Sequence, residues 1–393
     1  MANIIDYLKK YGNSSFEEEC FNELDAAIFA RLSYIDYASL INSRKYYSKK
    51  NLLKLSEKII KLNDSTRFRL NEDNILLQTL STSSRYKDIY IRTYVKQTDQ
   101  KKVKQFSAIT FINKSKRNSF ILISFRGTDG TYTGWKEDFE MCYKPSIPSQ
   151  DQAKKYALKT TRFAFRKKII LVGHSKGGNL AIYSSVFLNP KRIEAIYVFD
   201  SPGFNKSFLA DKKYLAIKPL IKSYLPQTSI IGRLLYSDNE NEIVDSNKSL
   251  LNQHNIYNWN INDVTFSKLS KFTYISNKIN DVIKRNLESM TYEEKIEFVE
   301  SLFSIIKEMT DDDVIQFSDS IFSFILRFNK ILKTKSDETK RLIFSIFKKS
   351  KYEEEIKKIE PIKNKKSIVS SIFGKFKKDK QEDLPVIENE IEN

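Results

Sequence analysis

The stretch Lys168-Ile-Ile-Leu-Val-Gly-His-Ser-Lys-Gly-Gly-Asn-Leu-Ala181 decides the fold. Its first five residues form a short, mostly apolar run, which is typical of a parallel strand buried on both faces. The run ends at Gly173, and the residues from Asn179 to Leu188 favour a helix. A strand that turns sharply into a helix predicts one βα unit of a parallel sheet.

Elements on either side of this unit extend the same pattern. Residues 86–126 contain three β-rich runs, which predict three strands, the last two as an antiparallel hairpin. Further patterns predict helices over 135–143 and 151–166, a strand over 195–199, a short helix over 219–225 and a strand over 228–236. Strands that alternate with helices in this way predict an α/β fold with a mostly parallel central sheet.

The length of 393 residues and the changes in pattern indicate three regions. Residues 1–266 are expected to form one α/β domain that begins with a helical segment. Residues 267–349 carry apolar side chains at helical spacing and predict an all-helical C-terminal region. Residues 350–393 are charged and predict a mobile tail, in which residues 367–378 form a basic amphipathic segment.

The formal net charge is +18, of which residues 1–266 carry +16 and residues 267–393 carry +2. A charge of this size favours anionic partners, such as an anionic membrane surface. A lysine-rich surface that is simply solvated explains the same count, so both interpretations stay open. The sequence has no Arg-rich stripe, RNP-like motif or helix-turn-helix spacing, so no nucleic acid is expected as a partner.

The two cysteines, Cys20 and Cys142, stand outside any metal-binding spacing. They are expected to be reduced thiols of a cytoplasmic protein, although one disulfide is possible by count. The N-terminus lacks the basic and long apolar regions of a signal peptide, and no apolar run reaches the length of a bilayer span. A soluble protein, or one that binds a membrane peripherally, is therefore expected.

The pentapeptide Gly173-His-Ser-Lys-Gly177 matches the pattern G-x-S-x-G. At a strand-to-helix turn this spacing places the serine on a sharp bend, because the glycines let neighbouring backbone approach without Cβ clashes. The Ser175 hydroxyl then stands at the top of the sheet, at the N-terminus of the following helix. The pattern alone has low specificity, but its position between a predicted strand and a predicted helix favours a nucleophile over an ordinary loop.

A serine nucleophile usually needs a base, most often a histidine, and this chain has two histidines. His174 lies beside the nucleophile in the turn, where its side chain cannot face Ser175 as a base does. His254 lies C-terminal to the turn, as the order serine, acid, histidine requires. We therefore expect His254 to be the base. Lys176 or another lysine is an alternative that leaves His254 without a role.

The acid is expected between the nucleophile and the base, just after a strand. Asp238 is the first choice, because it follows the strand predicted over 228–236. Glu240 and Asp245 are alternatives on the same loop. Asp200 is a further alternative, because it ends the preceding predicted strand. A single carboxylate in a loop is more often solvated than catalytic, so spacing is the main guide to this choice.

Acyl transfer also needs backbone N–H groups that stabilise the oxyanion. One donor is expected from Lys176, the residue after the nucleophile. The second is expected from the loop Phe125-Arg-Gly-Thr128, where Gly127 allows close backbone approach and Thr128 offers an N–H and a hydroxyl. Without the serine motif nearby, an ordinary glycine turn would explain this loop equally well.

Together these residues resemble the class 3 triacylglycerol lipases of the α/β-hydrolase superfamily. Phe125-Arg-Gly-Thr128 is similar to their F-R-G-[ST] oxyanion segment, and Trp135 and Asp138 resemble the W-x-x-D pair that follows it. Gly173–Gly178 is similar to their G-H-S-[LK]-G-G elbow. Phe199–Gly203 resembles their F-G-S-P-R segment and departs from it at the second and fifth residues.

A bacterial family of lipase-like proteins of uncharacterised function is a closer resemblance, over about residues 20–266. That family pairs a GHSKGGNLA elbow with a strand similar to Ser229–Leu235. It also has a Gln-His motif before a tryptophan, which Gln253, His254 and Trp259 carry here.

These resemblances imply an α/β-hydrolase fold and a serine hydrolase that cleaves carboxylic esters, with lipid or phospholipid acyl esters as the substrate class. The class 3 family implies a lid, here Gly130–Gln150, and Lys176 in place of the common Leu implies a more cationic entrance. The reaction needs no metal or organic cofactor. Two alternatives stay open: a thioesterase or peptidase with the same triad, and a non-catalytic hydrolase-fold protein that binds at an anionic membrane surface.

Overall fold

The computed structural model describes residues 2–41, 50–115, 118–162, 167–248, 250–309, 330–337 and 339–340. Residues 1–299 form one compact unit, and residues 300–393 form a second one. In the second unit, Lys335 forms an ion pair with Glu308 near the end of helix α11 (Tyr292–Met309). The charged tail predicted over 350–393, with its basic segment, lies outside the described residues.

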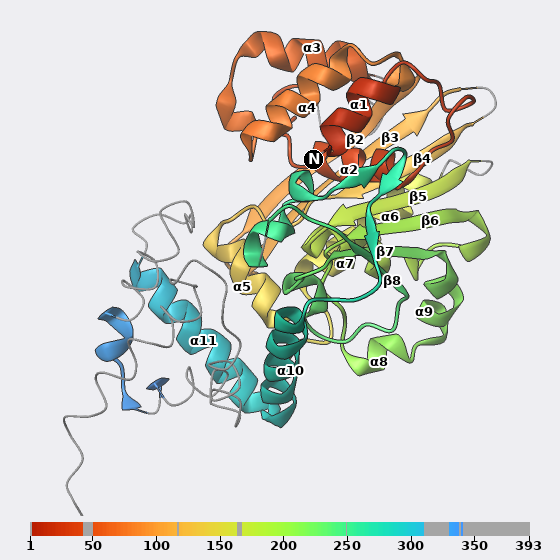
Figure 1. The fold of residues 1–393 in the computed structure, drawn as a ribbon. Coiled ribbons are helices and arrows are strands. Elements are labelled where there is room, and N and C mark those ends of the chain that lie inside the picture. The colour runs from red at the N-terminus through yellow and green to blue at the C-terminus, as the bar shows by residue number, and fades with distance from the viewer. Residues whose placement is uncertain are drawn as a thin grey trace, which may run out of the picture. The chain divides into compact units, whose positions relative to one another are not determined.

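Among the described residues of the first unit, a nine-stranded sheet has the order β1-β2-β3-β4-β5-β6-β7-β8-β11 (Figure 1). Strands β4 to β8 run parallel to one another. Strands β1 to β4 pair antiparallel, and β11 is antiparallel to β8. The strands are β1 (Lys50–Asn51), β2 (Ile89–Asp99), β3 (Lys104–Asn113), β4 (Phe120–Phe125), β5 (Lys168–His174), β6 (Ile193–Phe199), β7 (Ile221–Pro226), β8 (Asn241–Val244) and β11 (Lys268–Leu269). The short strands β9 (Ile261–Asn262) and β10 (Thr265–Phe266) pair separately.

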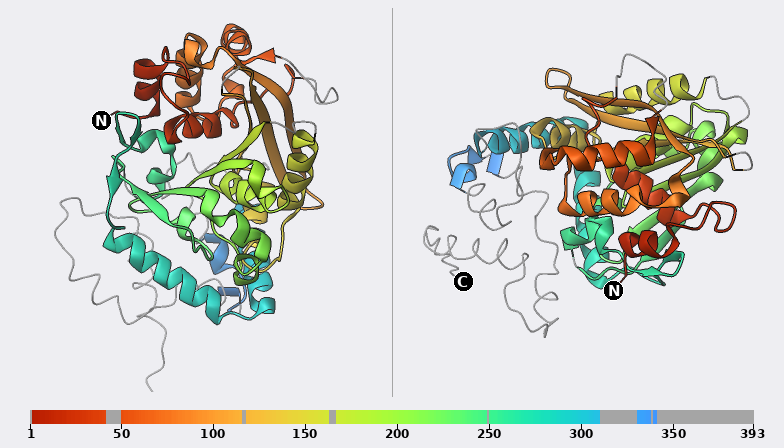
Figure 2. Two further views of the ribbon diagram at one scale, coloured as in Figure 1. Left: turned by 90° about the vertical axis from the view of Figure 1, so that its right-hand side faces the viewer. Right: turned by 90° about the horizontal axis from the view of Figure 1, so that it is seen from above.

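Helices cover both faces of this sheet, as the views in Figure 2 show. Helices α1 to α4 contribute to the core on one face, and α6 and α7 contribute to the core on the other. The helices of the first unit are α1 (Ile4–Tyr11), α2 (Glu23–Leu32), α3 (Leu52–Leu62), α4 (Asn71–Ser81), α5 (Tyr132–Glu140), α6 (Pro148–Thr161), α7 (Lys176–Ser185), α8 (Lys206–Leu209), α9 (Lys212–Ile217) and α10 (Tyr274–Ser289).

Strand β5 shows why its sequence is a continuous apolar run. Ile170 and Val172 belong to the core under the N-terminal helices. Ile169 and Leu171 belong to the core under α6 and α7. A strand covered on both faces has no position for a polar side chain, as is usual in parallel sheets. The parallel strands, the helices on both faces and the sharp turn from β5 into α7 together make an α/β-hydrolase fold, which confirms the predicted fold class.

Two predicted elements near residue 225 are wrong. The helix expected over 219–225 is a 3-10 turn at Lys218–Leu220 followed by strand β7. The strand expected over 228–236 contains a 3-10 turn at Ile231–Arg233 instead. Short apolar runs do not separate strand from helix or buried turn, because burial rather than periodicity makes them apolar.

The region after residue 266 is not entirely helical. Strand β11 joins the central sheet through β8, and only then does α10 begin, at its N-cap Thr273. Helix α10 packs within the first unit, where the Ser276 hydroxyl donates to the Ser229 carbonyl at 2.7 Å. The first unit therefore continues beyond the boundary at 266 that the sequence indicated.

Neither cysteine forms a disulfide, since Cys20 and Cys142 are both free thiols. No helix in the described part of the chain is long and apolar enough to cross a bilayer. Within the same residues, no cluster of His, Cys, Asp and Glu side chains is suited to hold a metal ion.

Candidate active site

Ser175 lies on the turn between β5 and α7 with a φ of 58° and a ψ of −136°. A positive φ is unfavourable for a residue with a side chain, so surrounding contacts must hold it. The Ser175 N–H donates to the Phe199 carbonyl at 2.9 Å, and its own carbonyl accepts from the Gly178 N–H at 2.9 Å. This strained backbone is the conformation that the G-x-S-x-G pattern predicts.

The two glycines of this turn are required by close contacts. A Cβ at Gly173 would lie 2.1 Å from the Gly177 carbonyl oxygen. A Cβ at Gly177 would lie 2.1 Å from the Phe125 carbonyl oxygen. Since no side chain fits at such distances, the turn packs directly on the end of β4. This contact brings the loop that follows β4 to Ser175.

His254 and Asp200 form a hydrogen-bonded pair beside the turn. His254 Nδ1 lies 2.6 Å from Asp200 Oδ2. Only 2% of the Asp200 side chain is exposed, whereas 27% of the His254 side chain is exposed. An acid that holds Nδ1 fixes the ring orientation and stabilises the imidazolium, which leaves Nε2 for proton transfer.

The second oxygen of Asp200 is held by a separate loop. Asp200 Oδ1 accepts from the Ser229 hydroxyl at 2.5 Å and from the Gly232 N–H at 3.0 Å. A Cβ at Gly232 would lie 2.4 Å from this same oxygen, so only glycine allows the backbone N–H to approach. Residues 229–232, predicted as part of a strand, therefore form the cradle of the Asp200 carboxylate.

The predicted contact of Asp238 with His254 is wrong. Asp238 accepts from the Tyr214 hydroxyl and forms an ion pair with Lys218 at 2.7 Å. Its loop follows a 3-10 turn rather than a strand, so it does not reach the edge of the sheet where Ser175 lies.

Glu240 and Asp245, which follow Asp238 along the chain, do not contact the histidine either. Asp245 accepts from the Asn260 amide at 2.7 Å, and within the described residues neither Asp245 nor Glu240 bonds to His254. Asp200, at the end of β6, is the acid that the structure brings to the histidine.

The residues around His254 hold its loop in place. The Gln253 side-chain oxygen accepts from the Thr228 N–H at 2.7 Å, and the Gln253 carbonyl accepts from the Trp259 indole N–H at 2.6 Å. Trp259 is fully buried. Gln253 and Trp259 thus anchor the loop that carries His254, while the histidine itself faces Asp200.

The loop after β4 lies against Ser175. A Cβ at Gly127 would lie 3.1 Å from the Ser175 Cβ. Within the described residues, the backbone N–H groups of Thr128 and Lys176 donate to no protein acceptor. Two free N–H groups near the serine are what an oxyanion site requires. The Thr128 hydroxyl is already used, because it donates to Asp138 Oδ2.

The Lys176 side chain is buried beneath the turn, with 1% exposed, and does not line an entrance to the site. Its Nζ lies 3.1 Å from Glu137 Oε2 and 3.2 Å from Asp138 Oδ1. Burial alone would lower the pKa of Lys176, but the carboxylates of Asp138 and Glu137 raise it. The cationic entrance expected from this lysine is therefore corrected to a buried ion-pair network.

Helix α5, which lies in the expected lid region Gly130–Gln150, is tied to its surroundings at Glu137. This carboxylate is fully buried and accepts from the Gln105 N–H at 2.9 Å and the Ser149 N–H at 2.8 Å. Together with Lys176, these bonds connect α5 to β3, to α6 and to the nucleophile turn. A helix whose buried carboxylate bonds to two backbone N–H groups and one lysine is unlike a lid that swings on glycine hinges.

Within the described residues, the Ser175 hydroxyl forms no hydrogen bond with His254. Catalytic hydrogen bonds are often long before substrate binds and tighten in the reacting complex. In the part of the chain that the structure describes, His254 is bonded to Asp200, and Ser175 lies nearby without a hydrogen bond to the histidine.

Several residues at the site were not found from the sequence. Glu137 stands next to Asp138 of the W-x-x-D pair, and this neighbourhood is the one signal that pointed toward it. Ser229 and Gly232 lay in a segment assigned to a strand. Tyr34, whose hydroxyl lies 2.9 Å from His174 Nδ1, is far away in sequence and had no local signal.

A scan of protein families matches residues 80–304 to the Mbeg1-like family. The match covers 225 of the 393 residues and includes the serine turn, Asp200 and His254. The chain belongs to the Mbeg1-like family. A comparison with curated proteins gave no match.

This Mbeg1-like chain is also similar to solved fungal lipases at low identity. The native Rhizomucor miehei lipase in complex with its propeptide is 14% identical, with a TM-score of 0.34, over 56% of this chain and 67% of that one. The lipase from Rhizopus microsporus var. chinensis is 12% identical, with a TM-score of 0.36, over 65% and 82%. The Lip2 lipase from Yarrowia lipolytica is 9% identical, with a TM-score of 0.36, over 64% and 86%.

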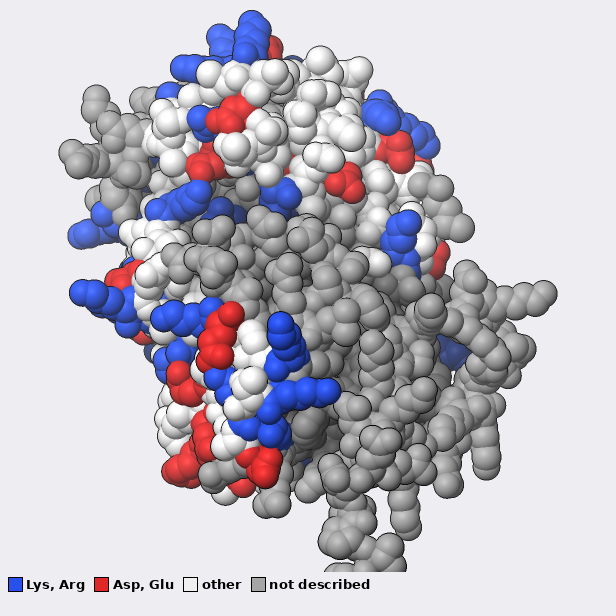
Figure 3. Space-filling model, turned by 90° about the vertical axis from the view of Figure 1, so that its left-hand side faces the viewer, with Lys and Arg blue, Asp and Glu red and all other residues white. Residues whose placement is uncertain are grey.

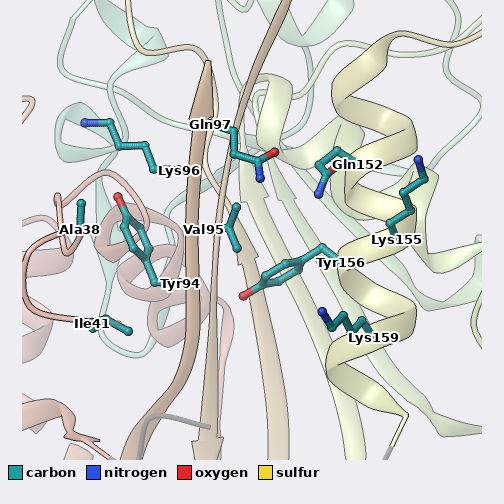
Figure 4. A pocket seen from close by; sticks show the side chains of 10 residues that line it. All are labelled: Ala38, Ile41, Tyr94, Val95, Lys96, Gln97, Gln152, Lys155, Tyr156 and Lys159. Atoms are coloured by element: carbon teal, nitrogen blue, oxygen red, sulfur yellow. The ribbon is translucent and has the colours of Figure 1, made fainter. Parts of the chain in front are cut away.

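A cavity of about 420 Å³ in this Mbeg1-like chain lies apart from the candidate site (Figure 4). Residues of β2, including Tyr94 and Lys96, line one side, and residues of α6, including Lys155 and Lys159, line the other. None of the proposed catalytic residues lines this cavity, so it gives no measure of the acyl-binding space.

The positive charge of the Mbeg1-like chain is mixed with negative charge on the face seen in Figure 3. On the described part of that face, Lys and Arg side chains stand beside Asp and Glu side chains rather than in a single basic patch. A solvated, lysine-rich surface is therefore enough to explain the charge seen there.

Proposed function

We propose that the chain is a serine hydrolase that cleaves carboxylic esters through an acyl-enzyme, with Ser175, His254 and Asp200 as its triad. The hydrogen bond between His254 and Asp200 carries this proposal. Asp200 and Ser175 directly follow two neighbouring parallel strands, because His174 at the end of β5 pairs with Phe199 at the end of β6. An oriented base and a strained serine thus meet at one edge of the sheet.

In the first half of the proposed reaction, Ser175 Oγ attacks the ester carbonyl carbon while His254 Nε2 takes the hydroxyl proton. The bond between that carbon and the alcohol oxygen then breaks. His254 returns the proton to the leaving alcohol, and the acyl group stays on Ser175. Asp200 keeps the Nδ1–H directed inward and stabilises the imidazolium.

In the second half, water attacks the acyl-enzyme as His254 takes one of its protons. The carboxylic acid leaves and Ser175 recovers its proton. The N–H groups of Thr128 and Lys176 stabilise the negative oxygen in both halves, with each donor contributing roughly 3 kcal/mol to the transition state. Every catalytic group in this proposed reaction is a side chain or a backbone N–H of this chain.

Lipid or phospholipid acyl esters are the proposed substrate class. The sequence resemblance of the oxyanion loop and the elbow to class 3 triacylglycerol lipases supports this choice. A thioester or amide would meet the same groups, because the triad serves acyl transfer generally. A panel of oxygen esters, thioesters and amides with matched acyl groups separates these classes by their kcat/KM values.

Labelling with a fluorophosphonate probe tests the proposal directly, because the probe reacts with an activated serine and needs no substrate. Wild-type protein is expected to be labelled, and Ser175→Ala and His254→Ala are expected to lose labelling. Ser201→Ala is a matched control, because Ser201 is also buried near the sheet edge and donates to the Pro202 carbonyl. Folded wild-type protein that stays unlabelled would contradict the proposed function.

A further inference from the structure

His174 precedes the nucleophile, and both nitrogens of its ring are engaged. Its Nδ1 lies 2.9 Å from the Tyr34 hydroxyl, and its Nε2 lies 2.6 Å from the backbone carbonyl oxygen of His254. The residue is buried, with 4% exposed. His174 therefore links the segment that carries Tyr34 to the loop that carries the proposed base.

These partners decide which ring nitrogen carries the proton. A carbonyl oxygen only accepts hydrogen bonds, so Nε2 of His174 must donate to His254. In a neutral ring Nδ1 is then an acceptor, and it takes the hydrogen bond of the Tyr34 hydroxyl. Burial and the neighbouring His254 ring hold the pKa of His174 well below its ordinary value, so the ring stays neutral.

Tyr34 is in turn held by a buried network. The Arg31 guanidinium lies over the Tyr34 ring, 4.3 Å from its centroid. Arg31 forms a buried ion pair with Asp73 at 2.7 Å, and Asp73 accepts from the Tyr257 hydroxyl at 2.8 Å. Tyr257 follows His254 by three residues, so the network returns to the base loop.

We propose that Tyr34 and His174 are positioning residues for His254. The His254 carbonyl fixes the tautomer in which His174 Nε2 donates, the Tyr34 hydroxyl satisfies the remaining acceptor Nδ1, and the Nε2 bond fixes the backbone of the base. Asp200 holds the ring of His254 by a different atom, so two independent bonds define where the base lies. The ring centroids of His174 and His254 are 4.4 Å apart, which restricts rotation of the base.

The effect of Tyr34 and His174 on catalysis by His254 rests on the proposed hydrolase function, whereas the tautomer of His174 does not. The two need separate experiments. The chain has two histidines, so the ring nitrogens of ¹⁵N-histidine-labelled protein give only two sets of NMR signals. Full-length protein purified without a histidine tag keeps the spectrum to these two rings, and His254→Ala assigns them.

The spectrum of the wild type is expected to show His174 as a neutral ring with the proton on Nε2, unchanged between pH 5.5 and 8. In Tyr34→Phe the Nδ1 signal of His174 is expected to move, because Nδ1 loses its hydrogen-bond donor, while the proton stays on Nε2. A wild-type ring with its proton on Nδ1, or a His174 spectrum that does not respond to Tyr34→Phe, would overturn the proposal.

Fluorophosphonate labelling tests the positioning role. His174→Gln keeps a donor, because the amide nitrogen of glutamine reaches about the place of Nε2, and His174→Leu removes the donor at similar size. We expect His174→Leu to lower the labelling rate at saturating probe about 10- to 100-fold, since small displacements of a catalytic group have effects of this order. The half-saturating probe concentration should change little. His174→Gln should stay within about fivefold, and Tyr34→Phe should fall between the two.

Tyr37→Phe is the matched control, because the Tyr37 hydroxyl is also buried but donates to the Leu32 carbonyl at 3.1 Å. It should change neither the labelling rate nor the His174 spectrum. Unlabelled, folded wild-type protein would remove the hydrolase function, and the spectrum would still test the tautomer. Wild-type labelling that is unaffected by Tyr34→Phe and His174→Leu in folded variants would overturn the positioning role. If His174→Leu fails to fold, Tyr34→Phe decides alone.

Discussion

Asp200 and Asp238 both follow the serine turn in sequence, but their surroundings differ in kind. Asp200 is 2% exposed and is held by His254, Ser229 and Gly232. Asp238 is 38% exposed and pairs with Lys218, which is 36% exposed. A buried carboxylate that is held by three hydrogen bonds can orient a histidine, whereas a solvated surface pair contributes little.

Asp200→Asn is therefore expected to lower the labelling rate by a factor on the order of 10³ to 10⁴, since an amide cannot stabilise the imidazolium and favours the wrong tautomer of the base. Asp238→Asn makes the same chemical change in a solvated pair and should stay within about twofold of wild type. The rate of fluorophosphonate labelling is measured for both variants and for the wild type. Equal losses in the two variants would contradict the assignment of Asp200.

The titration of the Asp138 carboxyl makes the stability of the fold depend on pH. Burial raises the pKa of this carboxyl from 3.8 to about 6, although Lys176 opposes the shift. A carboxyl whose pKa is raised in the folded state binds its proton more tightly there, so the contribution of Asp138 to stability is largest at low pH and falls as pH rises toward 6. A shift of this size corresponds to roughly 3 kcal/mol between pH 3.8 and 6.

Asp138→Asn removes this titration, since the amide keeps the acceptor for the Thr128 hydroxyl and stays neutral. The free energy of unfolding of the wild type, relative to the variant, should decrease between pH 4 and pH 6.5. Urea denaturation at a series of pH values measures it. A difference that is constant with pH, or that grows with pH, would show that Asp138 titrates outside this window.

At the scale of elements, α5 and the nucleophile turn are joined by Lys176. The carboxylates of Glu137 and Asp138 share this one buried cation. Removing one partner from such a group leaves the others charged and without compensation, which is more destabilising than the loss of a surface pair.

Lys176→Met should lower the free energy of unfolding by about 3 to 5 kcal/mol. Lys218→Met removes the cation of the exposed pair with Asp238 and should lower it by less than about 1 kcal/mol. Urea denaturation of both variants at pH 7.5 compares the two values. A similar small effect in both would mean that the buried network does not hold α5 to the turn.

The elements that the sequence placed correctly are those whose pattern is local. The residues that identify the serine turn are the apolar run of β5, two glycines and the start of α7, and these stand within twenty residues. The acid was misplaced because β7 was read one segment too late, so that the loop at Asp238 seemed to end a strand. The contact between Tyr34 and His174 spans 140 residues and depends on how α2 packs on the sheet, which no local pattern records.

At the scale of the whole molecule, α10 belongs to the unit that carries Ser175, Asp200 and His254. Its N-cap Thr273 donates from its N–H to the Gln227 carbonyl at 2.8 Å, and Ser276 donates to the Ser229 carbonyl. Ser229 belongs to residues 229–232, which form the cradle of the Asp200 carboxylate. The helix therefore supports the acid from outside the region that the sequence had assigned to the hydrolase domain.

A chain that ends at residue 309, after α11, should be labelled by the fluorophosphonate at a rate within about twofold of the full-length chain. A chain that ends at residue 266 lacks β11 and α10, and should be labelled at least about 100-fold more slowly. Both rates are measured alongside the thermal midpoint of unfolding. Full labelling of the shorter chain would show that the cradle of Asp200 does not need α10.

The first residues of the chain close onto the segment that carries the base. The Asn3 amide donates to the Tyr257 carbonyl at 3.0 Å, and the Ile261 N–H donates to the Ala2 carbonyl at 3.1 Å. The turn at Ser175 uses contacts with Phe125 and Phe199, whereas this closure joins residues that are 254 positions apart in the chain. Contacts between such distant segments form late and slowly. The segment that carries His254 is therefore expected to reach its final place late in folding, after neighbouring strands have paired.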